Sequence, residues 1–295
     1  MGQKLRFTLP TPLEYFAALV ADDGQINLLE AAACIAQDEF PQLDVQAVVD
    51  EVDKLGDRLV RRLPPDAAAG HRVRALTRYF HAELGFAGNV NNYYDSGNSY
   101  LHHVLATRRG IPISLAVIFL ELASQLGLRA QGVSFPGHFL VKLRVGTNEL
   151  LLDPFTGESL SRSRLDEILQ SYRHSSGLGA EGEMPLEYLL QPATNRQILA
   201  RMLRNLKEIH RQAQDWQRLL SVQQRLVLLL PHDLQERRDR GLVLEALGHW
   251  PAAAADLTHY LSAQGEGGAA QAGADSEELR ARLERLRSSG SPPLH

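Results

Sequence analysis

A spacing of 34 residues between similar segments is the feature that most restricts how the C-terminal third of this chain can fold. Trp216 and Trp250 stand at that spacing, and an apolar helical pattern follows each of them. The same offset joins further apolar pairs: Ile209 with Val243, Ala213 with Leu247, and Leu226 with Tyr260. A unit of this length holds two helices, so we expect stacked helical hairpins that bury their apolar faces against neighbours.

This pattern resembles the tetratricopeptide repeat, which has the same period. Gly248 and the small residues of Ala252–Ala255 fit it, because they let two helices approach closely. The resemblance implies a surface that holds a protein or peptide partner, and the alternative is a generic pair of helical hairpins. We place the helical repeat at residues 185–262. Residues 263–295 are expected to form a flexible tail with a possible short helix.

The front of the chain changes from helical to strand-like patterns along its length. Apolar residues recur with a helical period up to residue 84 and again over Pro112–Leu126, where Gly127 suits the helix end. The period then falls to two in three short runs that begin at Ala130, Phe139 and Glu149. The sequence therefore predicts an α+β fold that is predominantly helical, with a small antiparallel sheet. We assign residues 10–175 to this domain and residues 175–183 to a linker.

A polar segment interrupts this domain between Gly85 and Tyr100. It is rich in glycine, asparagine, serine and tyrosine and shows little periodicity. Polar loops of this length are uncommon inside a compact domain and are more often functional than idle. We expect it to form a hydrogen-bonding lip of a binding cleft, with Tyr94, Asn98 and Ser99 as candidate binding residues.

Charge and cysteine content narrow the classes of partner and compartment. The net charge is −4, with 31 basic and 35 acidic residues, so no basic face for nucleic acid is expected. Cys34 is the lone cysteine, which excludes an internal disulfide and a cysteine-based zinc site. No secretory signal and no membrane-spanning stretch are evident in the sequence, so we expect a cytoplasmic protein without a membrane partner.

Three ordered motifs carry the candidate chemistry. They are Gly110-Ile-Pro-Ile-Ser at the start of the apolar helix, Pro136-Gly-His-Phe before a strand, and Leu152-Asp-Pro after another strand. This order resembles the transglutaminase-like (papain-type) superfamily, in which a cysteine heads the helix. Backbone N–H groups and the helix dipole favour a thiolate there. The family then places a histidine base and an aspartate that orients it on the following strands.

The resemblance implies a role for each matching residue of this chain. Gly110 falls on the conserved glycine of the pattern, His138 on the base, and Asp153 on the residue that orients the base. Pro112 falls on the nucleophile, and a proline has no group that can attack a substrate. Cys34 belongs to a distant helix and is a poor substitute. His138 and Asp153 are therefore interpreted either as a retained structural pair or as a general base and its orienter.

Ser114 and two arginines are further candidate residues of this site. Ser114 lies two residues after Pro112, about 200° around the helix, so it more naturally satisfies a backbone group than attacks a substrate. Arg108 and Arg109 precede the helix and could clamp a carboxylate or phosphate, although a surface pair is the commoner arrangement. No metal and no cofactor are expected, since His102 and His103 are adjacent and lack an acidic neighbour at ligand spacing.

The motifs are most similar to those of the bacterial SirB-type branch, which joins such a domain to a tetratricopeptide tail. The resembling segments include Asn92–Leu101, Arg108–Ser114 and Phe135–Val141. We favour a non-catalytic protein that binds a protein or peptide and acts in regulation. The alternative is a hydrolase or acyl transferase acting on an amide, with His138 as general base.

Overall fold

The computed structural model describes residues 10–175, 184–266 and 274–289, so the expected linker after Ser175 and parts of the expected tail lie outside the described residues. The chain forms two compact units. One comprises residues 19–202, and the other comprises residues 203–295 together with residues 1–18. The division falls inside two helices, α1 (Pro12–Leu19) and α9 (Asn195–Gln212).

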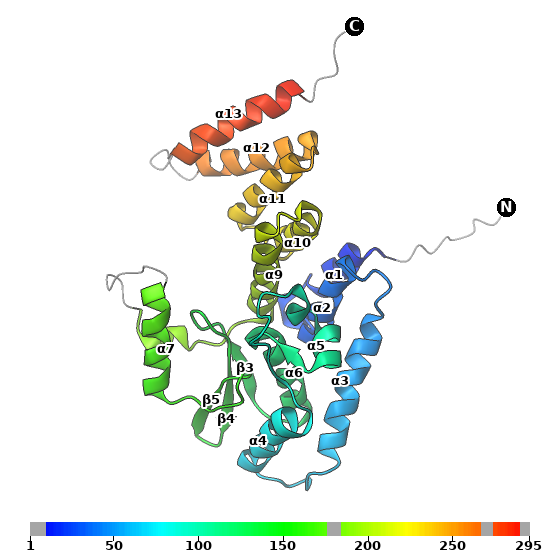
Figure 1. The fold of residues 1–295 in the computed structure, drawn as a ribbon, viewed down its shortest axis with the longest axis vertical. Coiled ribbons are helices and arrows are strands. Elements are labelled where there is room, and N and C mark those ends of the chain that lie inside the picture. The colour runs from blue at the N-terminus through cyan, green and yellow to red at the C-terminus, as the bar shows by residue number, and fades with distance from the viewer. Residues whose placement is uncertain (1–9, 176–183, 267–273, 290–295) are drawn as a thin grey trace, which may run out of the picture. The chain divides into compact units, whose positions relative to one another are not determined.

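The unit of residues 19–202 is built mainly from helices around a small sheet (Figure 1). Its helices are α2 (Leu28–Cys34), α3 (Val45–Val60), α4 (Ala69–Thr77), α5 (Leu101–Thr107), α6 (Pro112–Gln125), α7 (Arg162–Ser175) and α8 (Leu186–Leu189). Its strands are β1 (Ala87–Gly88), β2 (Arg109–Gly110), β3 (Ala130–Val133), β4 (Leu140–Val145) and β5 (Asn148–Leu152). The predicted fold class, mostly helical with a small sheet, is confirmed.

The larger sheet is antiparallel, with strand order β3-β4-β5. Val133 pairs with Leu140 across it, so both side chains share one face. That face packs against Leu165 and Leu169 of α7. Helix α6 also contacts β3 and β4, and Figure 1 shows it on the side of the sheet away from α7. The sheet is thus a middle layer between two helices.

Residues 184–202 pack against this sheet, although the sequence-based boundary placed them with the helical repeat. Pro192 forms an isolated antiparallel bridge with Val133, and the N–H of Ala193 donates to the carbonyl oxygen of Gly132 at 2.8 Å. Leu186 of α8 joins the cluster that α7 makes with the sheet. The physical reason for the difference is that β3 has an open edge, which this segment covers.

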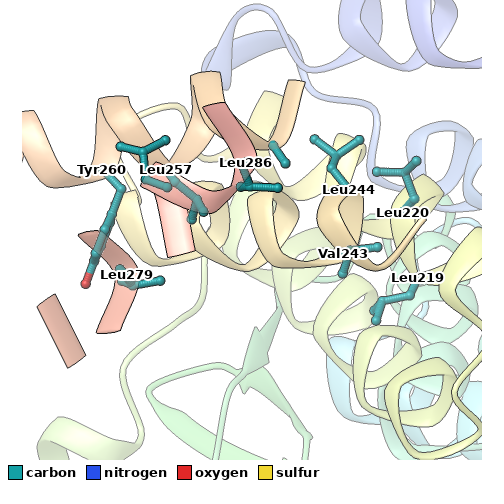
Figure 2. Close-up of a cluster of buried hydrophobic side chains, with 10 residues drawn as sticks. Leu219, Leu220, Val243, Leu244, Leu257, Tyr260, Leu279 and Leu286 are labelled. Atoms are coloured by element: carbon teal, nitrogen blue, oxygen red, sulfur yellow. The ribbon is translucent and has the colours of Figure 1, made fainter. Parts of the chain in front are cut away.

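The other unit consists of stacked helices. After α9 come α10 (Trp216–Leu229), α11 (Leu234–Ala246), α12 (Trp250–Glu266) and α13 (Ala274–Ser289). Figure 2 shows leucines of α10 to α13 converging on one cluster, with Leu257 of α12 among its members. Trp216 and Trp250 are the first residues of α10 and α12, so the 34-residue offset corresponds to equivalent positions in two hairpins.

Segments outside the expected repeat also belong to this unit. Helix α12 continues to Glu266, four residues into the segment that was expected to be flexible, and the possible helix of that segment is α13, whose Leu279, Leu283 and Leu286 are buried in the cluster. Helix α1 (Pro12–Leu19) also contributes, because the guanidinium of Arg225 lies 4.8 Å from the centre of the Phe16 ring. Both of these side chains are completely buried.

Candidate functional site

A tight turn between β3 and β4 presents His138. Pro136 and Gly137 occupy its central positions, and the N–H of His138 donates to the carbonyl oxygen of Phe135 at 3.0 Å. Gly137 has a φ of +67°, which a type II turn requires at this position and which favours glycine. A β-carbon there would also lie 2.6 Å from Cδ2 of Tyr172. The motif Pro-Gly-His is therefore fixed by both backbone geometry and packing.

A second turn, directly after β5, presents Asp153. One carboxylate oxygen, Oδ1, accepts the N–H of Phe155 at 2.8 Å, and the other, Oδ2, accepts the hydroxyl of Thr156 at 3.1 Å. The turn closes through the N–H of Gly157, which donates to the carbonyl oxygen of Asp153 at 2.8 Å. These contacts hold the carboxylate in one orientation.

The two turns bring His138 and Asp153 together, as the ordered motifs predict. Nε2 of His138 lies 3.0 Å from Oδ2 of Asp153, and both side chains are largely buried. Burial alone would raise the pKa of the Asp153 carboxyl. The hydrogen bond and the charge of His138, with the donors of Phe155 and Thr156, outweigh burial and hold that pKa below its ordinary value. Asp153 is therefore ionised at neutral pH.

The ionised carboxylate of Asp153 determines which ring nitrogen of His138 carries a proton. The carboxylate can only accept, so Nε2 of His138 must carry the proton that it donates. In the neutral ring Nδ1 is then a proton acceptor, and within the described residues no protein group hydrogen-bonds to it. This arrangement can accept a hydrogen bond from a ligand or a proton from a bound water.

The start of α6 is connected to the turn that carries Asp153. Strand β2, just before the helix, pairs in parallel with β1. The N–H of Gly88 in β1 donates to the carbonyl oxygen of Phe155 at 2.9 Å, and the N–H of Asn89 donates to the carbonyl oxygen of Gly110 at 3.0 Å. This short ladder joins the entry to α6 with the Asp153 turn. No sequence pattern indicates this ladder, because two-residue strands have no measurable period.

Pro112 and Ser114 occupy the first turn of α6. Pro112 is the first helical residue, where its missing N–H costs nothing. The Ser114 side chain is completely buried. Its Oγ donates to the carbonyl oxygen of Asn98 at 2.6 Å and accepts the N–H of Ile111 at 3.2 Å. The hydroxyl therefore ties the helix start to the preceding loop. Cys34 is also completely buried, in α2.

Asn98 and Ser99 lie inside the polar loop rather than on its surface. Both are 1% exposed. The Asn98 amide donates to the carbonyl oxygens of Asn92 at 2.6 Å and Tyr93 at 3.1 Å, and it accepts the side-chain amide of Asn89 at 2.9 Å. The Asn98 side chain thus holds the loop in shape. Ser99 Oγ is buried and has no hydrogen-bond partner among the residues that the structure describes.

Arg108, Arg109 and Tyr94 are placed differently from one another. The Arg108 guanidinium lies 4.7 Å from the centre of the Phe86 ring and 3.6 Å from a carboxylate oxygen of Glu51. Arg109 is exposed, and its Nη1 donates to the carbonyl oxygens of Gly85 at 2.7 Å and Arg108 at 3.0 Å. Tyr94 is 73% exposed. Tyr94 and Arg109 are thus open to a ligand, whereas Arg108 is half-buried.

A second histidine near Asp153 escaped the sequence reasoning. His81 lies in a single π-helical turn, Arg78–Glu83, a feature that often marks functional positions. Its Nδ1 is 2.9 Å from the carbonyl oxygen of Phe86, so Nδ1 donates, and Nε2 is a buried acceptor without a partner. Burial lowers the pKa of His81, against the opposing effects of Phe86 and Asp153. His81 is therefore neutral at pH 7.

Arg201 of α9 was also missed. Its Nη1 donates to Ser134 Oγ at 2.6 Å and to the carbonyl oxygen of Phe135 at 3.0 Å. The second acceptor is the same oxygen that the N–H of His138 uses, so the guanidinium is bound to the turn that presents His138. The sequence shows a basic residue between the apolar Ala200 and Met202, but this pattern does not reveal the partners of Arg201.

Other parts of the molecule offer a cavity but no metal centre. A cavity of about 510 Å³ is lined by residues of segments 24–29, 117–132 and 193–198. Its lining includes neither His138 nor Asp153. In the parts of the chain that the structure describes, no group of three histidine, cysteine, aspartate or glutamate side chains could hold a metal ion. Within the same ranges, no helix has both the length and the apolar character to cross a membrane.

Comparison with known proteins agrees with both halves of the structure. The family model of the transglutaminase-like superfamily matches residues 46–204, and a tetratricopeptide repeat model matches residues 206–284. Fold and site thus define a transglutaminase-like domain that is followed by tetratricopeptide repeats. No solved structure matches the chain significantly.

Named relatives narrow the class further. A UPF0162 protein of Xylella fastidiosa (strain 9a5c) is 38% identical over 240 residues, which cover 81% of this chain and 85% of that relative. YchA of Escherichia coli (strain K12), also a UPF0162 protein, is 27% identical over 80% of this chain and 84% of its own length. Protein SirB1 of Salmonella typhimurium is 27% identical over 76% of this chain and 80% of its own length. The chain belongs to the UPF0162 family of the transglutaminase-like superfamily, as the resemblance to SirB-type proteins predicts.

Proposed function

We propose that this protein binds a protein or peptide segment at its transglutaminase-like site without breaking a bond, and that the helical repeat provides a second contact surface. In this proposal the protein acts in regulation, in the cytoplasm, and needs neither a cofactor nor nucleic acid. His138 and Asp153 then form the floor of a binding site, and Asn98 and Ser99 keep the neighbouring loop in shape.

The main support for this proposal is that the first turn of α6 offers no free nucleophile. A covalent mechanism of the superfamily needs a nucleophile at the head of this helix. Pro112 stands there, and the nearby hydroxyl of Ser114 is buried and hydrogen-bonded to the backbone. Cys34 is buried in another helix. These positions support binding over covalent catalysis.

Exposed aromatic side chains on both units support a role in binding. In the polar loop Tyr94 and Val90 are more than 70% exposed, and the rings of Tyr93 and Tyr94 touch edge to face. In the repeat, Trp216 and Trp250 are both more than a third exposed. Large aromatic groups on a surface are favoured contact residues in protein interfaces.

Site-specific photo-crosslinking tests the proposal. A photoreactive benzoylphenylalanine replaces Tyr94 in one protein and Glu149, an exposed residue of β5, in the control. Each is irradiated in an extract of the source cells. We expect a discrete crosslinked protein at position 94 that excess unlabelled protein suppresses, and none at position 149. Equal or unsuppressed crosslinking at both positions would argue against a specific binding site.

The intact pair of His138 and Asp153 favours one alternative, a hydrolase that acts on an amide with His138 as general base. The ionised Asp153 and the acceptor Nδ1 of His138 suit the activation of water. This alternative predicts turnover of ester or amide substrates that is lost in His138→Ala and retained in Ser114→Ala. Turnover with that pattern would replace the binding proposal.

A further inference from the structure

Arg201 carries a positive charge that its two hydrogen bonds to the His138 turn do not require. Nη1 supplies both hydrogen bonds to the turn, at Ser134 and Phe135. A neutral amide could supply two donors as well. Within the described residues no carboxylate lies at ion-pair distance from Arg201, and the groups that act on it electrostatically are Tyr93 and Tyr172. A partly buried, uncompensated guanidinium is costly unless a ligand neutralises it.

The geometry of Arg201 leaves a specific set of donors open. The two bonds at Nη1 fix the plane of the guanidinium, and the ring of Phe139 lies 5.7 Å below it. Nε and Nη2 form the opposite edge, and neither has a protein acceptor in the described part of the chain. Two parallel N–H groups on one edge match the two oxygens of a carboxylate.

This edge belongs to the same site as His138. Arg201 and the N–H of His138 share the carbonyl oxygen of Phe135. Tyr93 contacts the ring of Phe155, in the turn of Asp153, and also feels the charge of Arg201. Tyr172 packs against Gly137 of the His138 turn and also acts electrostatically on Arg201. The surroundings are thus a cation and aromatic rings beside a hydrogen-bond acceptor.

We infer that Arg201 binds a carboxylate of the segment that occupies the His138 site. The inference rests on the proposed binding function and adds the chemistry of its ligand. The carboxylate can be the C-terminus of a peptide or the side chain of an acidic residue, and both present the same two oxygens. Nδ1 of His138, the ring nitrogen that does not face Asp153, accepts a hydrogen bond from the ligand beside it.

Three short peptides test this inference on the full-length protein. One is N-acetyl-trialanine with a free carboxylate, the second is its C-terminal amide, and the third is N-acetyl-Ala-Glu-Ala amide. Binding is followed by NMR through the imidazole resonance of His138, assigned by its loss in His138→Gln. We expect at least one carboxylate peptide to bind about tenfold more tightly than the neutral amide, as befits a hydrogen bond to a charged group. The peptide that does so identifies the source of the carboxylate.

Arg201→Gln should abolish the preference for the carboxylate, whereas Arg144→Gln, which removes the same charge from an exposed residue of β4, should retain it. Arg201→Lys keeps a charge without the paired donors and should show an intermediate preference; it also serves if Arg201→Gln does not fold. A preference that survives in Arg201→Gln, or equal binding of carboxylate and amide peptides by the natural protein, overturns the inference alone. If none of the three peptides binds, both the inference and the proposed function are overturned.

Discussion

Pro112 is the first residue of α6, and the proposed function interprets it as a lost nucleophile, so replacing it tests whether the rest of the site is still competent. In Pro112→Cys, made in a Cys34→Ala background, the new thiol would stand at a helix start, and the proposed site places it near the imidazole of His138. Both features favour the thiolate, so we expect a pKa below the ordinary ~8.5. The pH dependence of alkylation by iodoacetamide measures it. An ordinary pKa would mean that His138 does not face this position.

Gly137 is a residue whose replacement separates backbone strain from packing. Gly137→Ala must adopt a φ of +67° and place its β-carbon 2.6 Å from the Tyr172 ring. The control is Gly146→Ala, which has a φ of +64° but no atom within 4 Å of its β-carbon. We expect the control to lose about 1 kcal/mol in the free energy of unfolding and Gly137→Ala to lose about 2–4 kcal/mol. Urea denaturation checks both, and equal losses would contradict the packing argument.

Much of the site at this scale follows from the sequence, for reasons that are local. The dipeptide Pro136-Gly137 specifies its own turn, and Asp153 followed by Pro154 specifies another, so both side chains could be placed without the structure. Arg201 could not, because its partners Ser134 and Phe135 are more than 60 residues away along the chain. Asn98 was expected at a surface, since the sequence does not reveal that its amide is used within its own loop.

Among the elements, the π-helical turn that carries His81 should make folding sensitive to mild acid. The pKa of His81 is below the ordinary 6.5 in the folded state, chiefly because the side chain is buried. The unfolded chain therefore takes up the proton first, and stability falls as the pH drops through about 6.5. We expect His81→Gln, which keeps a donor toward Phe86, to lose less stability between about pH 7.5 and pH 5.5 than the natural protein.

Urea denaturation at the two pH values measures the difference for His81→Gln and for a control, His71→Gln, at an exposed position of α4. The control should behave like the natural protein. If His81→Gln and the natural protein respond equally to acid, His81 is not the group that titrates on unfolding.

The sequence predicts elements well where a period is long enough to measure. Alternation and the turns at Gly137 and Gly146 located the three strands of the main sheet, which the structure confirms. The two-residue strands β1 and β2 carry no period, and a π-helical turn has the same apolar pattern as an α-helix. Both features therefore emerge only from the structure, although together they support the turn of Asp153.

At the scale of the whole molecule, the helical repeat has its own core, and Leu257 is at its centre. The side chain is completely buried among leucines of α10, α11 and α13 (Figure 2). Leu257→Ala should lower the free energy of unfolding of this unit by about 2–5 kcal/mol, through lost contacts and a residual cavity.

Hydrogen exchange of the amides in α11 and α12 measures this loss, and Leu242→Ala, at a partly buried position packed against the same cluster, is the milder comparison. Unchanged protection in Leu257→Ala would contradict a single cooperative core. The period of 34 residues predicted this stack, but it did not predict α13, because that helix continues the packing without a third tryptophan.

Trp216 and Trp250 are intrinsic fluorescent probes of the helical repeat. They are the two tryptophans of the chain, and both open helices of the repeat unit. Both indoles are partly exposed, so their emission should respond to solvent and to a ligand that covers them. Intrinsic tryptophan fluorescence therefore reports on the repeat, whereas the transglutaminase-like domain contributes only tyrosine emission. Excitation at a long wavelength, which selects tryptophan, can follow the repeat alone in the intact protein.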